Sequence, residues 1–340
     1  MTENADLIKF AVVGCGHIGK RHATMIQQNP EAELVALVDI MSKEDLGLED
    51  LDVPLFSDID SMLASDIDVD VVNICTANGL HSENALAALN SKKHVVVEKP
   101  LGLFTSNCEQ VISTALDVSR QVFCVMQNRY SPPSVWLKSL MNENRLGDIY
   151  MVQLHCYWNR GDQYYKKGSW KGTIALDGGS LFTQFSHFVD MMYWLFGDIT
   201  DINAKFENFG HQDSTEFEDS GLVTFKFVNG GIGSMNYSTA VWDKNMESSI
   251  TIVGSKGTVK VGGQYMDTVE YCHIEDYEMP ELISATTKHD YGDYKGSANN
   301  HHFVMENVID TLKGKTKVST NALEGMKVVD IIQRIYSYRK

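Results

Sequence analysis

The sequence, 340 residues long, lacks the marks of several protein classes. Its six cysteines are scattered and form no CxxC pair, which argues against a disulfide framework or a zinc ribbon and favours buried thiols in a reducing compartment. No cluster of His, Cys and acidic residues has a spacing suited to metal ligands, so we predict no metal site. The sequence has no uncharged apolar run long enough to span a bilayer, and its first residues lack the apolar core of a signal peptide. We therefore expect a cytoplasmic protein that is not attached to a membrane.

Positive charge is also scarce. The chain has 29 Lys and Arg against 45 Asp and Glu, which gives a formal net charge of −16. Such a charge repels nucleic-acid backbones and anionic membranes, so binding to either through a broad basic face is excluded. An anionic small ligand would need a local cluster of cations. Because 43% of the residues are hydrophobic and no low-complexity tract is present, we expect a folded protein, and its length favours two domains.

Strand-like and helix-like segments alternate over the first third of the chain. Apolar runs typical of buried parallel strands lie at 8–15, 34–38, 69–76, 94–98 and 122–127. Segments with helical periodicity lie between them at 17–28, 82–90 and 106–119. This alternation favours right-handed βαβ units, so we predict an α/β domain over residues 1–128 with a doubly wound parallel sheet, the Rossmann arrangement.

The rest of the chain has a different pattern. Strand-like segments at 149–157, 199–206, 221–227, 231–237, 248–253 and 258–261 are separated by turn signals such as Asn229-Gly230-Gly231. Helical patterns lie at 132–144, 182–196, 299–312 and 322–338. We predict an α+β domain over residues 129–340 with an open, mostly antiparallel sheet. Because an exposed sheet face tends to be covered, we expect a homo-oligomer, and the sequence does not distinguish dimer from tetramer.

A glycine-rich loop follows the first predicted strand. Gly14, Gly16 and Gly19 form a G-x-G-x-x-G element in which the first glycine permits a tight turn, the second lets the backbone approach a pyrophosphate, and the third lets helix and strand pack closely. The helix N-terminus that follows favours negative charge. The next strand ends in Asp39, 25 residues after Gly14, whose carboxylate can accept hydrogen bonds from ribose hydroxyls and repel a 2′-phosphate. We predict NAD as the cofactor in preference to NADP, against the alternative of a glycine turn beside a solvated Asp.

A lysine follows the strand predicted at 94–98. Ligands of open α/β sheets bind at the carboxyl ends of the strands, which is where Lys99 lies. Pro100 favours an extended conformation for the residue before it, which helps to aim the lysine side chain. Burial lowers the pKa of a lysine, so Lys99 could exchange a proton with a hydroxyl or carbonyl group. The alternative is a surface lysine at a strand end.

Four motifs carry a resemblance to a known family. They are GCGHIG at 14–19, TANGLH at 76–81, EKP at 98–100 and DGGSLFTQFSH at 177–187. Through them the sequence resembles the glucose–fructose oxidoreductase / inositol dehydrogenase / MocA family over most of its length. The resemblance implies a nucleotide-binding domain followed by a domain whose open sheet forms oligomer contacts. It also implies hydride transfer between NAD(P) and a hydroxyl-bearing carbon of a sugar or cyclitol.

The resemblance assigns candidate site residues. The family's lysine and histidine that face nicotinamide and substrate correspond to Lys99 and His187, of which Lys99 is favoured as the acid/base. The implied cofactor-binding residues are Gly14, Gly16, His17, Ile18, Gly19, Asp39, Thr76, Asn78, His81, Glu98, Lys99 and Gln127.

The sequence departs from the family pattern at two positions. Many members carry Asp four residues before the histidine, whereas this chain has Thr183, which can still form a hydrogen bond with a substrate hydroxyl. Ala77 lies where proline is common, which puts the geometry of that loop in doubt.

A segment of the second domain points to the substrate. Residues 158–171 contain four cations and four aromatic rings in an otherwise acidic protein, and cations can bind phosphates or a carboxylate while rings cover a sugar or base. The surrounding motifs are similar to the branch that oxidises C3 of UDP-N-acetylglucosaminuronic acid for bacterial surface polysaccharides. The substrate-binding candidates are Thr183, Arg160, Tyr164, Tyr165, Trp170, Lys171, Gln184 and Arg129. The rival interpretation is a solvated loop or a subunit contact.

Two other functions stay open at this point. The same enzyme class could act on inositol or a free hexose, and a non-catalytic NAD-binding regulatory protein could retain the same fold. His301-His302 could bring an imidazole to the substrate, although an ordinary pair at a helix start is the favoured interpretation.

Overall fold

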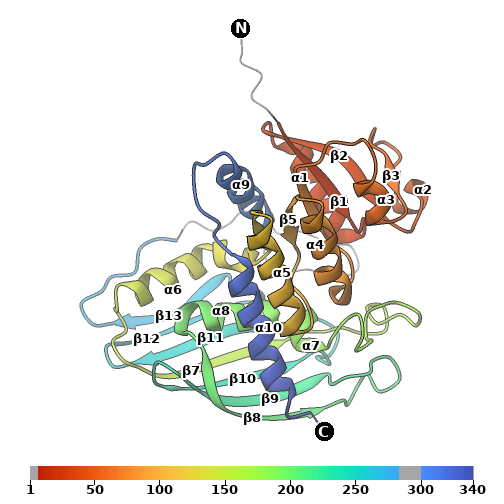
Figure 1. The fold of residues 1–340 in the computed structure, drawn as a ribbon. Coiled ribbons are helices and arrows are strands. Elements are labelled where there is room, and N and C mark those ends of the chain that lie inside the picture. Colours follow the sequence, from red (N-terminus) through yellow and green to blue (C-terminus); the bar gives the residue numbers. More distant parts are fainter. Residues whose placement is uncertain (1–6, 283–299, 340) are drawn as a thin grey trace. The chain divides into compact units, whose positions relative to one another are not determined.

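The computed structural model describes residues 7–282 and 300–339. The chain divides into two compact units, of which the first comprises residues 1–125 and 301–329 and the second residues 126–300 and 330–340 (Figure 1). Among the described residues no helix combines the length and apolar character needed to cross a membrane.

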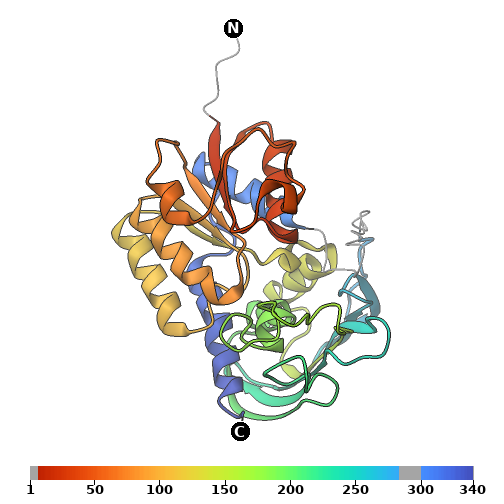
Figure 2. The same ribbon diagram turned by 90° about the vertical axis from the view of Figure 1, so that its right-hand side faces the viewer.

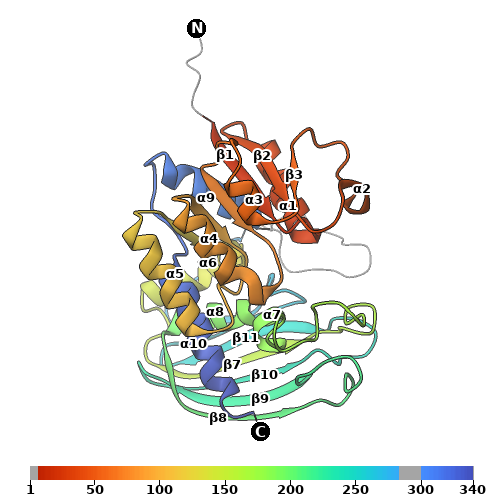
Figure 3. The same cartoon turned by 45° about the vertical axis from the view of Figure 1, so that its right-hand side comes forward.

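The first unit contains a six-stranded parallel sheet in the order β3-β2-β1-β4-β5-β6 (Figure 3). Its strands are β1 (Ile8–Val13), β2 (Ala32–Val38), β3 (Leu55–Phe56), β4 (Val71–Ile74), β5 (His94–Val97) and β6 (Val122–Cys124). Its helices are α1 (His17–Gln28), α2 (Lys43–Leu46), α3 (Ile59–Leu63), η1 (Asn78–Leu80), α4 (His81–Asn90), α5 (Thr105–Asp117) and α9 (His301–Leu312). The predicted doubly wound parallel sheet is confirmed. The strand order reverses between β1 and β4, which is where such sheets bind ligands.

The tail of the chain is shared between the units. Residues 301–329 belong to the first unit, whereas we expected the whole tail in the domain that begins at residue 129. Helix α9 contacts α1, and Lys313 Nζ donates to Glu31 Oε1 at 2.6 Å. Helix α10 (Ala322–Tyr336) begins in the first unit and ends in the second. Helical periodicity predicts which face of a tail helix is apolar but not which domain that face contacts.

The second unit contains a seven-stranded mixed sheet in the order β13-β12-β11-β7-β10-β9-β8 (Figure 1). Its strands are β7 (Ile149–Tyr157), β8 (Ile199–Glu207), β9 (Ser220–Phe227), β10 (Ile232–Ser238), β11 (Glu247–Gly254), β12 (Gly257–Gly262) and β13 (Thr268–Ile274). All neighbouring pairs are antiparallel except β7 and β10, which run parallel. The predicted mostly antiparallel sheet is confirmed, while the parallel pair and β13 were not predicted. Strands 75 residues apart carry no local signal of their pairing, and the polar residues of β13 weaken its strand pattern.

Helices cover one face of this second sheet (Figure 2). They are η2 (Gln127–Tyr130), α6 (Pro132–Asn142), α7 (Ser180–Thr183) and α8 (Ser186–Phe196). In β9 the residues Val223, Phe225 and Phe227 are buried while Leu222 and the other alternate residues are exposed, as expected for a sheet packed on one side. The helix expected at 182–196 is interrupted between α7 and α8, which gives α8 its own first turn at Ser186.

Candidate active site

The glycine loop leaves room for a ligand at one glycine and none at the other two. A Cβ on Gly14 (φ +87°) would lie 2.8 Å from the backbone of Cys75, and one on Gly19 would lie 1.9 Å from the carbonyl oxygen of Gly14. A Cβ on Gly16 would meet nothing within 4 Å, and the exposed Gly16 provides no side-chain cap for α1. The first and third glycines are therefore required by the packing of the chain itself. The open space at Gly16, before the N–H groups of α1, fits the diphosphate of a dinucleotide.

Asp39 lies beside this loop at the end of β2. Its Oδ2 accepts the N–H of Cys15 at 2.6 Å and its Oδ1 accepts the N–H of Met41 at 3.0 Å. These two backbone bonds orient the carboxylate, and each oxygen keeps a second lone pair for another donor. The arrangement fits the ribose hydroxyls of NAD, and its negative charge disfavours the 2′-phosphate of NADP.

A buried histidine ties the loop after β4 to the loop after β5. His81 Nε2 lies 3.0 Å from the carbonyl oxygen of Thr76, and its Nδ1 lies 2.6 Å from the carbonyl oxygen of Pro100. The His81 ring therefore connects the two loops. Asn78, three residues before His81, is also buried. Ala77 has φ −65° and ψ 146°, the backbone conformation that proline would impose. Ala77 therefore has a backbone conformation that proline could also adopt.

Glu98 and Lys99 directly follow β5, and their environments differ. Lys99 is half-buried and joined to Pro100 by a cis peptide bond. Glu98 is buried, and its carboxylate is bound by the imidazoles of His22 and His301 and by the backbone N–H of Lys99. Glu98 thus has partners inside its own unit, and its assignment to the cofactor stays a prediction.

In the second unit His187 lies in the first turn of α8, and Gln127 of η2 contacts it. The Gln127 side-chain nitrogen lies 3.1 Å from His187 Nε2. An amide nitrogen can only donate, so Nε2 of the buried imidazole accepts and a neutral ring carries its proton on Nδ1. Two residues further along η2, Arg129 forms a bidentate ion pair with the buried Asp190, at 2.8 and 2.6 Å. Arg129 is thus oriented by a carboxylate of its own unit, and its assignment to the substrate stays a prediction.

The carboxylate of Asp177 contacts Thr183. The hydroxyl of Thr183 donates to the carboxylate of Asp177 and lies 3.1 Å from the carbonyl oxygen of the same residue. Asp177 is fully buried, and its other carboxylate oxygen accepts the N–H of Gly172 at 2.9 Å. The Thr183 oxygen therefore keeps lone pairs but has its proton directed at Asp177.

Several substrate candidates from residues 158–171 form one connected cluster with Gln184. Arg160 Nε donates to Gln184 Oε1 at 2.7 Å, and Gln184 Nε2 donates to the Tyr164 hydroxyl at 2.6 Å. Lys171 Nζ lies 3.8 Å from the centre of the Tyr164 ring, a cation–π contact. Burial lowers the pKa of Lys171 to about 8, with Asp177 opposing the shift and Arg160 adding to it. This cluster of Arg160, Tyr164, Lys171 and Gln184 holds two cations in fixed positions.

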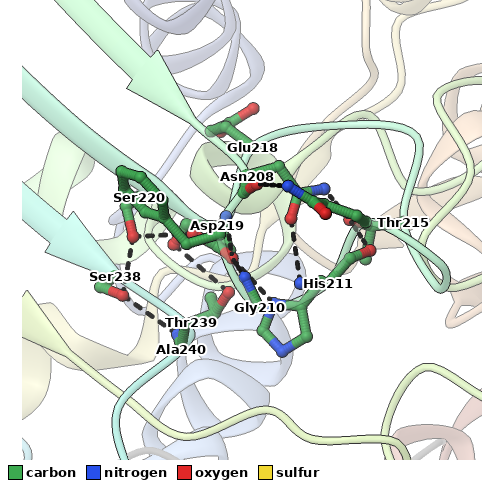
Figure 4. Close-up of polar contacts among 12 residues, drawn as sticks. Asn208, Gly210, His211, Thr215, Glu218, Asp219, Ser220, Ser238, Thr239 and Ala240 are labelled. Atoms are coloured by element: carbon green, nitrogen blue, oxygen red, sulfur yellow. Dashed lines mark hydrogen bonds and ion pairs between the residues drawn. The ribbon is translucent and has the colours of Figure 1, made fainter.

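Tyr165, next to Tyr164 in the sequence, packs against other aromatic rings. Its ring is buried and packs edge-on against His211 at 5.2 Å and against Phe217 at 6.3 Å. Figure 4 shows the loop that carries these contacts, in which Asp219 accepts the N–H groups of Phe209 and Gly210 at 2.9 and 2.6 Å. The Tyr165 ring thus packs the cationic segment against this loop, and its assignment to the substrate stays a prediction. Trp170 is half-buried in the same segment.

The sequence interpretation missed His22, Asp177 and the role of His301. A signal existed for His22, because it follows Gly19 by three residues and precedes Ile26 by four, on the buried face of α1. His301 was considered only as a substrate ligand or a helix-start residue. Asp177 was quoted within a motif, but no local pattern pairs it with Thr183.

Comparison with known proteins matches both units. Residues 8–125 match the model of the oxidoreductase family with an NAD-binding Rossmann fold, and residues 135–260 match that of the GFO/IDH/MocA C-terminal domain. The WlbA dehydrogenase of Chromobacterium violaceum, solved with NADH and UDP-GlcNAcA, is 30% identical with a TM-score of 0.85 over 99% of this chain and 94% of its own. The WlbA dehydrogenase of Bordetella pertussis, solved with the same two ligands, is 29% identical with a TM-score of 0.84 over 97% and 96% of the two chains. The D-glucoside 3-dehydrogenase of Escherichia coli K12 is 25% identical over 97% of this chain and 94% of its own length.

The two family matches, the open glycine loop with its oriented Asp39 and the similarity to enzymes that oxidise sugars agree with one another. The chain belongs to the GFO/IDH/MocA family, the glucose–fructose oxidoreductase / inositol dehydrogenase / MocA family, and is an NAD-dependent sugar oxidoreductase.

Proposed function

We propose that the protein oxidises C3 of UDP-N-acetylglucosaminuronic acid, with NAD as hydride acceptor. The observation that carries the proposal is the cluster of Arg160, Tyr164, Lys171 and Gln184, which fixes two cations in a chain of net charge −16. A substrate with a carboxylate and a diphosphate needs such cations, whereas inositol and free hexoses are neutral. The two WlbA dehydrogenases, which are similar over almost the whole chain, were solved with UDP-GlcNAcA.

The proposed chemistry moves one hydride and one proton from the substrate. The C3–H bond breaks with its electron pair, the O–H bond loses its proton, and a C=O bond forms. Bound NAD supplies the acceptor for the hydride at C4 of its nicotinamide. The neutral amine of Lys99 takes the hydroxyl proton, and the product is a 3-keto sugar.

His187 is proposed as the partner that donates to the reacting oxygen. With Nε2 accepting from Gln127, a neutral ring carries its proton on Nδ1 and cannot serve as a base through that nitrogen. This supports Lys99 as the base and His187 as the residue that orients the hydroxyl. Thr183, whose proton is directed at Asp177, is proposed to accept a hydrogen bond from a neighbouring donor of the substrate.

A panel of substrates tests the proposal. NADH formation at 340 nm is measured with UDP-N-acetylglucosaminuronic acid, UDP-N-acetylglucosamine, myo-inositol and glucose. We expect turnover with the first, a loss of at least about 100-fold in kcat/KM with the second, which lacks the carboxylate, and none with the neutral polyols. Turnover on inositol or glucose without any response to a UDP-sugar would refute the substrate assignment and favour a free-sugar dehydrogenase.

A further inference from the structure

A buried polar cluster lies directly beneath Lys99 in the first unit. It consists of Glu98 at the end of β5, His22 of α1 and His301 of α9, which are 6%, 2% and 3% exposed. These residues come from three separate elements, and the third is more than 200 residues from the other two along the chain. Neither the proposed chemistry nor the cofactor site described above uses this carboxylate or these imidazoles.

The hydrogen bonds of the cluster orient its carboxylate. Asn73 Nδ2 donates to His22 Nδ1 at 2.9 Å, which places the proton of a neutral ring on Nε2. His22 Nε2 then donates to Glu98 Oε1 at 3.0 Å, and His301 Nε2 lies 3.5 Å from the same oxygen. The second oxygen of Glu98 accepts the backbone N–H of Lys99 at 3.3 Å.

The carboxylate stays ionised in this environment. Burial by itself raises the pKa of Glu98, but the hydrogen bonds and the electrostatic attraction from His22 and His301 together hold the pKa well below its usual value. Replacement of a buried ion pair by apolar residues of similar volume is often neutral or stabilising. The presence of a buried, hydrogen-bonded anion here therefore calls for an explanation other than stability.

The backbone around Lys99 is held on both sides. Before it, Glu98 binds the Lys99 N–H, and after it, His81 binds the carbonyl oxygen of Pro100. Glu98 is buried whereas Lys99 is half-buried. Glu98 thus reaches Lys99 through the main chain and not through the amine.

We infer that Glu98, held in place by His22 and His301, is a positioning residue that fixes the main chain of Lys99 and thereby the placement of its amine. The inference rests on the proposed function in so far as Lys99 is the base of the reaction. Misplacement of a reacting group by about 1 Å lowers a rate by about 100-fold, which sets the scale of the expected effect.

The test compares three variants of the cluster with a matched control. Glu98→Gln removes the charge at constant size, His301→Leu removes a donor, and His301→Gln keeps a nitrogen at the place of Nε2. The control is His94→Asn, which removes a half-buried histidine from the opposite end of the same strand, where its Nδ1 accepts the N–H of Gln121 at 3.0 Å. Each purified variant is assayed for NAD affinity, for kcat and KM, and for acetylation of Lys99 by acetic anhydride, followed by peptide mass spectrometry across pH 6–10.

We expect Glu98→Gln and His301→Leu to lower kcat by about 10- to 100-fold with KM and NAD affinity within about threefold of the parent. The acetylation rate of Lys99 should change by at least about threefold in the same variants, while that of the other lysines stays constant. His301→Gln should recover most of the loss, and His94→Asn should behave like the parent. If Glu98→Gln does not fold, the His301 pair gives the same comparison.

Two results overturn the inference: unchanged acetylation of Lys99 and unchanged kcat in both loss variants, or equal losses in the control. The acetylation readout needs no substrate. A parent protein that turns over no UDP-sugar would therefore refute the proposed substrate while the positioning of Lys99 is still tested.

Discussion

The protonation of Lys171 should make the KM for the substrate depend on pH. Burial lowers its pKa to about 8, so its ammonium form falls from about 90% of molecules at pH 7 to about 10% at pH 9. In the proposed function a cationic Lys171 binds an anionic group of the substrate, and its neutral form does not. We therefore expect KM for UDP-N-acetylglucosaminuronic acid to rise as pH rises from 7 to 9, by up to about tenfold.

Substitutions separate the titration of Lys171 from other effects of pH. Lys171→Met removes the cation at every pH, and loss of one charge-assisted hydrogen bond, about 1.5–3 kcal/mol, raises KM by about 10- to 150-fold at pH 7. Lys171→Arg stays charged from pH 7 to 9. Its KM should therefore change with pH only as much as the KM of Lys171→Met, which reports the pH effects that do not come from residue 171. Lys167→Met, which removes an exposed lysine of the same segment, is the control.

The assay is the initial rate of NADH formation at saturating NAD, with substrate varied at each pH. The reasoning is refuted if the parent KM is constant from pH 7 to 9, or if Lys171→Met retains the parent's pH dependence.

The remaining predictions concern the base and the cofactor loop. Lys99→Ala should lower kcat by about 100- to 10,000-fold while NAD affinity, measured by fluorescence titration, changes less than about threefold; near-normal turnover would remove Lys99 from the chemistry. Asp39→Ala should lower the ratio of NAD to NADP affinity by at least about tenfold, and an unchanged ratio would contradict the role of the carboxylate. Gly19→Ala should lower the free energy of unfolding by at least about 2 kcal/mol, because the added Cβ would lie 1.9 Å from the carbonyl oxygen of Gly14. Gly16→Ala has open space and should leave thermal stability nearly unchanged while weakening NAD binding; equal destabilisation by both alanines in melting curves would argue against the distinction.

The parallel sheet and the cofactor loop could be predicted because their signals are local. The helix predicted at 17–28 has those same bounds in the structure, and the glycine loop and Asp39 are adjacent through the pairing of β1 and β2. Fully buried strands read as apolar runs, and a turn that admits only glycine is recorded in the sequence. Strand-like segments separated by turn signals likewise predicted the mostly antiparallel sheet of the second unit.

Other features were decided only by tertiary structure, because both partners of each contact lie far apart along the chain. The motif EKP predicts that Glu98 binds the cofactor, but no local pattern predicts its contacts with His22 and His301. The family resemblance assigned Arg129 to the substrate, and no local pattern pairs it with Asp190, which lies 61 residues later. The sequence indicated that the site lacks a carboxylate at position 183, but in the structure the Thr183 hydroxyl donates to the carboxylate of Asp177.

The features that the sequence predicts and those that it does not differ in the sequence distance between the interacting residues. Periodicity, glycine geometry and turn residues act within a few residues, so the sequence by itself determined the order of elements, the cofactor loop and the class of reaction that the motifs imply. The partner of a buried charge, the domain that a tail helix joins and the strand that lies beside β7 depend on contacts between distant segments. Those contacts form only when the whole chain buries its apolar surface, and the tertiary structure alone records them.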